Sequence, residues 1–245
     1  MHVLVVYAHH SPTSFCRALL EQVELGLAEA GHTHEVIDLH AEGFDPVFRD
    51  ADQAAFIHHT TPPELLERDV LEAVLVGSAR DPVRRFLRRR WARGRSREEL
   101  VSVFEQHRPA DVAAHQERVA RADGLIFVAP VFWMGFPAIL KGWFERVFAY
   151  GFAYTLEPRG WRGDLEGRVP LLTQSKALVL TPTFFTEAEY DSGWRDAMDT
   201  VVCDWGLKMA GVQQAEHVYF YAVLAAGEAG RAGYLERARA LARDF

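Results

Sequence analysis

Three adjacent apolar side chains, Phe132, Trp133 and Met134, stand between a strand pattern and a helical pattern. The strand pattern ends in the apolar run 125–128 and breaks at Pro130. In an open α/β sheet, ligands bind in the crevice outside the carboxyl ends of the strands. An aromatic loop in that place could stack on a flat apolar ring. The alternative is a hydrophobic loop that a subunit interface covers.

A second candidate is the loop from His9 to Ser14, which follows the first strand pattern. A helical pattern begins directly after it, so free backbone N–H groups and the positive end of the helix dipole meet there. Ser11, Thr13 and Ser14 add hydroxyl groups, and together these donors could hold a phosphate. A turn of this composition is also an ordinary N-cap, and the residues alone leave both interpretations open. No GxGxxG or GxxxxGKS/T motif occurs, which argues against a Rossmann dinucleotide fold or a P-loop NTPase.

The elements that would position these loops alternate as strand and helix along the chain. Strand patterns lie near residues 2–8, 35–39, 122–129, 177–180 and 218–221. Helical patterns include those near residues 138–149, 192–210 and 228–243. The alternation predicts an α/β fold, a doubly wound parallel sheet of five strands in the flavodoxin order 2-1-3-4-5.

The connection between the second and third strands is too long for a plain crossover, and residues 51–110 are interpreted as a helical, arginine-rich insertion. Capping boxes at Thr61 and Ser96 each predict the start of a helix, and Asp111 is expected to cap a third. Between Arg80 and Arg97, nine arginines and one acid give a local charge of +8, which leaves −15 for the remainder of a chain of net charge −7.

Within that segment, Val83, Leu87 and Trp91 are spaced by four and flanked by arginines, which predicts a basic amphipathic helix. Its basic face is either solvated and packed against the acidic body, or it binds a partner subunit, an anionic substrate or a cofactor phosphate. The mostly acidic remainder argues against a nucleic-acid binder.

Size and composition predict one domain, residues 1–245, because 245 residues with 49% hydrophobic content can bury a large core. Cys16 and Cys203 cannot build a disulfide framework. The adjacent pair His58-His59 is interpreted as surface loop, so no metal site is expected. No apolar run is long enough for a membrane span and the chain starts directly with a strand pattern, so a cytoplasmic protein is expected.

A long ordered string carries a resemblance to a known family. It begins at Trp133 as W-x-G-x-P-A-I-L-K-G-W-F-E-R-V-F and continues in F-A-Y-T at 152–155. This string resembles the signature loop and helix of the NAD(P)H:quinone oxidoreductases of the flavodoxin-like superfamily, the group of DT-diaphorase. The segment from Ala8 to Leu19 is similar to the family's flavin-phosphate loop. The resemblance implies bound FAD rather than FMN, NAD(P)H as co-substrate, a quinone or similar aromatic acceptor, and a homodimer.

The resemblance also implies roles for individual residues in hydride transfer from NAD(P)H through the flavin to the acceptor. The expected catalytic residues are Tyr190, which stabilises charge, with Trp133 and Tyr154 in the pocket. The expected cofactor-binding residues form three loops: His9, Thr13, Ser14, Phe15 and Cys16; Pro130, Val131, Phe132, Trp133 and Met134; and Thr181, Pro182, Thr183 and Phe184.

Four of these positions depart from the family pattern. Cys16 replaces an asparagine, Phe132 replaces a common glutamine, and Thr183 and Phe184 replace two glycines. Three alternatives therefore stay open: an azo- or nitro-reducing relative, a relative that has lost its flavin, and a non-catalytic subunit of the kind that accompanies potassium-efflux antiporters. In the last case the arginine-rich segment would be the docking arm.

Overall fold

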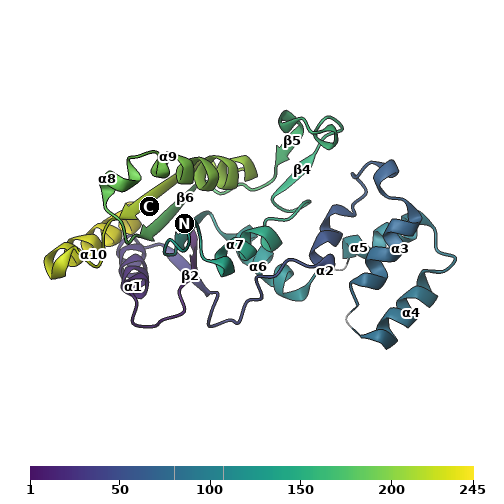
Figure 1. Cartoon of the computed structure of the whole chain (residues 1–245), viewed down its shortest axis with the longest axis horizontal. Coiled ribbons are helices and arrows are strands. Elements are labelled where there is room, and N and C mark those ends of the chain that lie inside the picture. The colour runs from purple at the N-terminus through teal and green to yellow at the C-terminus, as the bar shows by residue number, and fades with distance from the viewer. Residues whose placement is uncertain (80, 107) are drawn as a thin grey trace. The chain divides into compact units, whose positions relative to one another are not determined.

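The computed structural model describes residues 1–79, 81–106 and 108–245, so Arg80 of the arginine-rich segment lies outside the described residues. The chain forms two compact units (Figure 1). The sheet unit comprises Met1–Pro46, Glu117–Trp143 and Leu172–Phe245. The helical unit comprises Val47–Gln116 and Phe144–Leu171 and takes in most of the predicted insertion. That the whole chain is a single domain stays a prediction.

The sheet unit is built on five parallel strands. They are β1 (His2–Tyr7), β2 (Thr33–Asp38), β3 (Gly124–Val128), β6 (Lys176–Pro182) and β7 (Gln214–Phe220). Their order is β2-β1-β3-β6-β7, which is 2-1-3-4-5 when the strands of this sheet are counted along the chain. The predicted parallel sheet is confirmed, and β1, β3 and β6 lie at its centre.

A continuous apolar core explains why these residues form a central sheet. Residues 3–6 of β1 and residues 125–128 of β3 expose none of their surface. One face packs against α1 (Phe15–Glu29) and α10 (Gly227–Arg243), which contribute leucines and alanines to the same apolar cluster. Strands buried on both faces read as unbroken apolar runs, which made this part of the fold predictable.

Helix α7 (Ala138–Val147) begins where the aromatic loop ends, and Trp143 packs its ring against Phe127 of β3 with ring centroids 6.0 Å apart. Gly142 of the same helix is held so close to the chain that a Cβ atom there would lie 2.1 Å from the carbonyl oxygen of Pro46. The glycine is therefore required by packing. Helix α6 (Ala110–Arg121) precedes β3 and is shared between the two units.

Two short helices follow β6 in the sheet unit, α8 (Glu187–Tyr190) and α9 (Trp194–Asp199). The chain continues from α9 as a π-helix over Thr200–Leu207 and a 3₁₀ turn over Lys208–Ala210. The predicted helix over residues 192–210 is thus confirmed in extent, although its hydrogen-bond pattern changes along its length.

The helical unit contains α2 (Asp50–Gln53), α3 (Arg68–Gly77), α4 (Pro82–Ala92) and α5 (Arg97–Gln106), with 3₁₀ turns at Ala54–Phe56 and Pro63–Leu65. A smaller apolar cluster joins α3, α4, α5 and the 3₁₀ turn at Ala54–Phe56. The hairpin of β4 (Tyr154–Leu156) and β5 (Arg168–Pro170) belongs to the same unit, with 3₁₀ turns at Gly160–Arg162 and Leu165–Gly167. Among the described residues, no helix has both the length and the apolar character that crossing a membrane requires.

The three predicted helix starts have different outcomes. The box at Ser96 is confirmed, because the Ser96 N–H donates to Glu99 at 2.8 Å and the Glu99 N–H donates back at 3.2 Å. The box at Thr61 is wrong: its hydroxyl donates to the Phe56 carbonyl at 2.7 Å, and α3 begins only at Arg68. Helix α6 begins at Ala110, so Asp111 lies within its first turn.

Candidate functional site

The ends of the three central strands bring the predicted loops to one edge of the sheet. Tyr7 of β1 pairs with Val128 of β3, and Val128 pairs with Leu180 of β6. The loops that follow these strands therefore start side by side. Across the gap between the first two loops, the rings of His9 and Phe132 have centroids 6.1 Å apart. This edge is where an open parallel sheet binds its ligand.

In the first loop, the Ser11 N–H donates to His9 Nδ1 at 3.0 Å. Burial, together with the nearby His10 and His40, lowers the pKa of His9, so the ring is neutral at neutral pH. A neutral ring that accepts at Nδ1 carries its proton on Nε2. His9 therefore offers one N–H donor beyond the loop.

Ser14 ends this loop as the N-cap of α1, and its hydroxyl accepts from the Arg17 N–H at 3.2 Å. Capping satisfies one donor of the first turn, while the remaining N–H groups of that turn have no partner within the helix. Thr13 is exposed, and its hydroxyl lies 3.2 Å from that of Ser11. The N-terminus of α1 thus fits an anionic group.

The aromatic loop is a tight and strained turn. Phe132 and Gly135 exchange two backbone hydrogen bonds, of 2.9 and 3.2 Å, and Trp133 and Met134 between them have φ values of 46° and 67°. Two positive φ values between paired residues form the type I′ hairpin turn, which favours asparagine and glycine. Bulky side chains there are unfavourable, and such strain concentrates at ligand sites. Trp133 is also 97% exposed, so its indole is presented almost whole to whatever binds this edge.

The third loop is closed against β7. The Thr183 N–H donates to the Phe220 carbonyl at 2.9 Å, so it is not available to the edge of a bound ring. Thr181, Pro182 and Thr183 are buried, and only Phe184, at 68% exposure, projects from this segment. The replacement of the family's two glycines thus accompanies a loop that offers an aromatic side chain in place of backbone donors.

Tyr190, expected to be catalytic, is 1% exposed. Its ring is parallel to that of Trp194 at a centroid distance of 4.7 Å, and it contacts the rings of Tyr219 and Tyr221. Burial raises the pKa of its hydroxyl to about 12. Tyr190 therefore has almost no surface to offer a ligand, and its catalytic role stays a prediction that this placement does not favour.

Cys16 departs from expectation for the same reason. The thiol belongs to the apolar core under α1, with 2% of the residue exposed, and burial raises its pKa to about 12. A protonated, enclosed thiol is neither a nucleophile nor a ligand contact.

Of the fourteen expected cofactor-binding residues, those that keep exposed surface are His9, Thr13, Ser14, Phe15, Val131, Phe132, Trp133, Met134 and Phe184; Cys16, Pro130, Thr181, Pro182 and Thr183 are buried.

Sequence reasoning missed a polar network beneath the third loop. The hydroxyl of Thr181 lies 2.9 Å from His217 Nε2, and His217 Nδ1 lies 2.8 Å from the hydroxyl of Tyr219. That hydroxyl donates to Asp199 at 2.7 Å. Burial lowers the pKa of His217, although the carboxylate of Asp199 opposes the shift. Alternation along β7 could have shown that His217 shares a face with Tyr219, but not that Asp199 faces them both.

Tyr154, the remaining expected catalytic residue, lies on β4 in the helical unit. The guanidinium of Arg168 on β5 lies 4.2 Å from the centroid of its ring, and the ring of Tyr150 lies 5.8 Å away. Burial raises the pKa of the Tyr154 hydroxyl, although the charge of Arg168 opposes the shift. Its part in a ligand pocket stays a prediction.

The arginine-rich segment forms α4, and its apolar stripe faces outward. Val83, Leu87 and Trp91 are 62, 55 and 41% exposed. Two of the arginines bind the end of α3: Arg85 Nε donates to the Ala79 carbonyl at 2.8 Å, and Arg88 Nη1 donates to the Leu75 carbonyl at 3.0 Å. Arg85 and Arg88 therefore have a structural role. Replacing all the arginines of α4 would remove these hydrogen bonds together with the positive charge.

Comparison with known proteins agrees with the fold and with the signature string. A family model described as flavodoxin-like fold matches residues 1–242. A solved NAD(P)H:quinone oxidoreductase from Methanothermobacter marburgensis is 30% identical, with a TM-score of 0.69, over 100% of this chain and 98% of that one. The chain belongs to the flavodoxin-like family.

Two mammalian relatives match this flavodoxin-like chain over part of their length. NAD(P)H dehydrogenase [quinone] 1 of Cavia porcellus is 32% identical over 170 residues, which cover 69% of this chain and 51% of the relative. Ribosyldihydronicotinamide dehydrogenase [quinone] of Homo sapiens is 30% identical over 172 residues, which cover 70% and 61%. The chain thus covers only about half to three fifths of these proteins. Their names agree with the enzyme class that the signature string predicts.

Proposed function

We propose that this protein is a flavin-dependent oxidoreductase that passes hydride from NAD(P)H to a quinone or similar aromatic acceptor. The observation that carries the proposal is the strained, exposed turn at Trp133 and Met134 at the ligand-binding edge of a flavodoxin-like sheet. An indole held out by an unfavourable backbone is suited to covering a planar ring. The names of the relatives support hydride transfer to quinones as the reaction.

The residues with exposed surface fit a flavin at its phosphate end and along its ring. The first turn of α1, with Thr13 and Ser14, would hold the phosphate, and His9 would donate from Nε2. Phe132 and Trp133 would flank the ring. The bound flavin would accept hydride from NAD(P)H and pass it to the acceptor, while the protein would orient both and exclude water from the stacked faces.

We further propose FAD rather than FMN as the cofactor, with the active form a homodimer. Tyr154 is proposed to line the acceptor pocket. Because Thr183 uses its N–H on Phe220, we propose that Phe184 contacts the ring instead. The cytoplasmic location stays a prediction.

The visible absorption spectrum of the purified protein tests the cofactor, recorded after saturation with FAD or FMN and removal of unbound flavin. We expect the protein to retain one equivalent of flavin per chain after treatment with FAD, and less after treatment with FMN. A protein that retains neither flavin would contradict the proposal. Equal retention of both would contradict only the preference for FAD.

Quinone-dependent oxidation of NADPH then tests the reaction. Trp133→Ala should lower kcat/KM by about two- to tenfold, since loss of an aromatic stacking partner costs about 0.5–1.5 kcal/mol. Leu25→Ala, which shortens an exposed apolar side chain on α1, is the matched control and should turn over like the wild type. Equal rates for all three proteins would show that the turn at Trp133 does not cover the reacting ring.

A further inference from the structure

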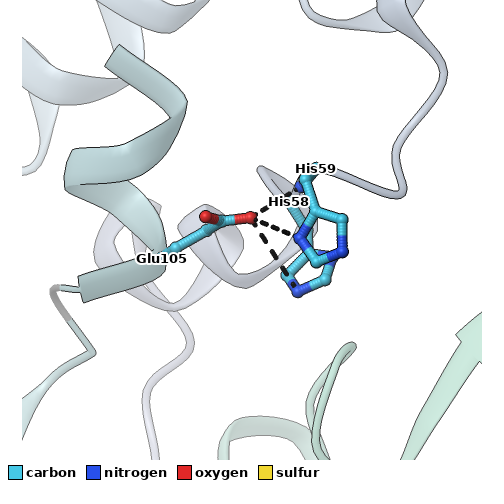
Figure 2. Close-up of side chains that lie close together, drawn as sticks. All are labelled: His58, His59 and Glu105. Atoms are coloured by element: carbon cyan, nitrogen blue, oxygen red, sulfur yellow. Dashed lines mark hydrogen bonds and ion pairs between the residues drawn. The ribbon is translucent and has the colours of Figure 1, made fainter. Parts of the chain in front are cut away.

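A cluster of three side chains that can bind a metal lies in the helical unit. His58 and His59 follow the 3₁₀ turn at Ala54–Phe56, and Glu105 lies near the end of α5 (Figure 2). In the sequence, no carboxylate stands at a spacing from the histidine pair that is typical of a metal site. The fold supplies one from 46 residues away. The histidine pair is therefore part of a cluster that spacing in the sequence does not predict.

The donor atoms of the cluster converge on one point. Glu105 Oε1 lies 2.8 Å from His59 Nδ1 and 3.9 Å from His58 Nε2, and it also accepts the backbone N–H of His59 at 2.7 Å (Figure 2). One ligand atom from each of the three residues lies within 4.8 Å of the others. Ligands around a tetrahedral zinc ion with bonds of about 2.0–2.1 Å stand roughly 3.3 Å apart, so small rotations would suffice.

A chain of hydroxyl groups orients the less exposed imidazole. His58 Nδ1 is hydrogen-bonded to the Thr60 hydroxyl at 2.8 Å, and that hydroxyl is bonded to the Tyr150 hydroxyl at 2.8 Å. Thr155 donates to the same Tyr150 oxygen at 3.0 Å. With Nδ1 engaged, Nε2 is the nitrogen that faces Glu105. The Thr60 backbone N–H also donates to His58 Nδ1 at 3.3 Å, so binding an ion through Nε2 requires the ring proton to move to Nδ1, where the Thr60 hydroxyl can accept it. Outer hydrogen bonds of this kind hold the direction of a metal-binding histidine.

The local charge and exposure also suit a cation. The side chains of His58, His59 and Glu105 are 26, 69 and 29% exposed, so an ion can reach them. Arg108 contributes an opposing positive charge, but its guanidinium is turned to Gln116, to which Nη1 donates at 2.7 Å.

We propose that His58 Nε2, His59 Nδ1 and a carboxylate oxygen of Glu105 bind one Zn²⁺ ion, with water as the fourth ligand. Two imidazoles and one carboxylate form a borderline-soft donor set, which binds zinc in preference to calcium or magnesium. For Nδ1 to bind the ion, the ring of His59 has to carry its proton on Nε2, so the hydrogen bond from Nδ1 to Glu105 is replaced by bonds from both groups to the ion. The ion then links the loop at residues 58–60 to α5.

A second group, Asp199, Cys203 and His217, also has ligand atoms close together in the described chain. Its polar atoms are already occupied, because Asp199 and His217 are both bonded to Tyr219. Burial raises the pKa of the Cys203 thiol to about 12, which disfavours the thiolate that zinc requires. This group therefore serves as the internal control.

The test is a calorimetric titration of the full chain with ZnCl₂ after treatment with a chelator, together with the visible spectrum on adding Co²⁺. We expect one equivalent of zinc, d–d bands of the intensity typical of tetrahedral cobalt, and a higher Tm with zinc. Glu105→Gln keeps an oxygen for the His59 N–H but removes the charge, and it should weaken zinc binding at least about 100-fold. His59→Ala should do the same, and Thr60→Val should weaken it about tenfold.

Two controls should bind zinc like the wild type: Cys203→Ser, in the second group, and His32→Ala, an imidazole outside both groups. Unchanged binding by Glu105→Gln would overturn the proposal, as would less than one equivalent in the wild type or loss of zinc in Cys203→Ser. Far-UV circular dichroism verifies that each variant is folded. Since Glu105→Gln retains the hydrogen bond that its position needs, the test does not depend on His59→Ala folding.

Discussion

The sheet unit and the helical unit are stabilised in different ways. The central strands of the sheet unit, β1 and β3, carry apolar side chains that are buried, and helices that cover the sheet add more apolar surface. The helical unit has a smaller apolar cluster, and a buried ion pair elsewhere in the unit also links its elements. Arg146 is 5% exposed and bonds Asp52 at 2.8 Å and Asp111 at 2.6 Å. A parallel sheet can be specified by apolar pattern alone, whereas short helices with little core need ionic and hydrogen-bonded links.

The largest effect expected from this difference follows removal of Arg146. Arg146→Met leaves the carboxylate of Asp52, whose side chain is 3% exposed, buried without its counter-charge. Breaking a buried pair in this way costs about 3–5 kcal/mol. Urea denaturation should show that loss in the free energy of unfolding.

The double variant Arg146→Met with Asp52→Asn is the control for this interpretation. It removes the unpaired charge but keeps an oxygen for the Arg49 N–H, which donates to Asp52 at 2.9 Å. We expect it to recover part of the loss. If the double variant is less stable than Arg146→Met, burial of an unpaired charge is not the cause.

In the sheet unit the expected sensitivity is steric. Gly142→Ala places a methyl group 2.1 Å from the carbonyl oxygen of Pro46, so α7 has to move. Overpacking of this kind costs about 1–3 kcal/mol. Gly233→Ala in α10 is the matched control, because nothing lies within 4 Å of the new methyl group. It should stabilise by about 0.4–1 kcal/mol. Thermal unfolding of both variants should therefore shift in opposite directions.

The two units also differ in how much of them the sequence could predict. The strands of the sheet unit were predictable because runs such as residues 3–6 are apolar without interruption. The capping box at Ser96 was predictable because all its partners are local. The box at Thr61 fits the same S/T-x-x-E pattern, but the chain after it forms a separate 3₁₀ turn over Pro63–Leu65, and Leu66 leaves the helical region with φ −108° and ψ 46°. Local pattern does not decide between these outcomes.

The candidate site shows the same limit. The aromatic turn could be predicted from residues 132–134, but its positive φ values could not, because tryptophan and methionine rarely adopt them. The burial of Tyr190 depends on Trp194, Tyr219 and Tyr221, which come from two other elements. The carboxylate that joins His58 and His59 is 46 residues distant. Contacts of this range depend on tertiary structure rather than on spacing.

Relief of the strained turn would separate function from stability within the sheet unit. Replacing Trp133 by Asn and Met134 by Gly installs the pair that a type I′ turn favours. We expect the free energy of unfolding to rise by about 1–2 kcal/mol and quinone-dependent NADPH oxidation to fall. If stability does not rise, the two positive φ values carry no strain. If turnover is retained, the aromatic side chains at the turn are not needed for the reaction.

The smallest expected effect concerns the polar network of the sheet unit. Because burial holds the pKa of His217 below its ordinary value of 6.5, the unfolded chain binds more protons there than the folded protein as the pH falls below about 6.5. The stabilisation by the neutral ring is therefore complete above that pH and is lost progressively toward the lower, folded pKa, with a slope of at most about 1.4 kcal/mol per pH unit. His217→Asn removes this proton linkage, so the free energy of unfolding of the variant should depend less steeply on pH between 7 and 5 than that of the wild type.

Other histidines contribute equally to the pH dependence of both proteins and cancel in the difference. Parallel pH profiles would mean that His217 binds protons equally in the folded and unfolded states, and burial of its ring in the polar network would then not contribute to the pH dependence of stability.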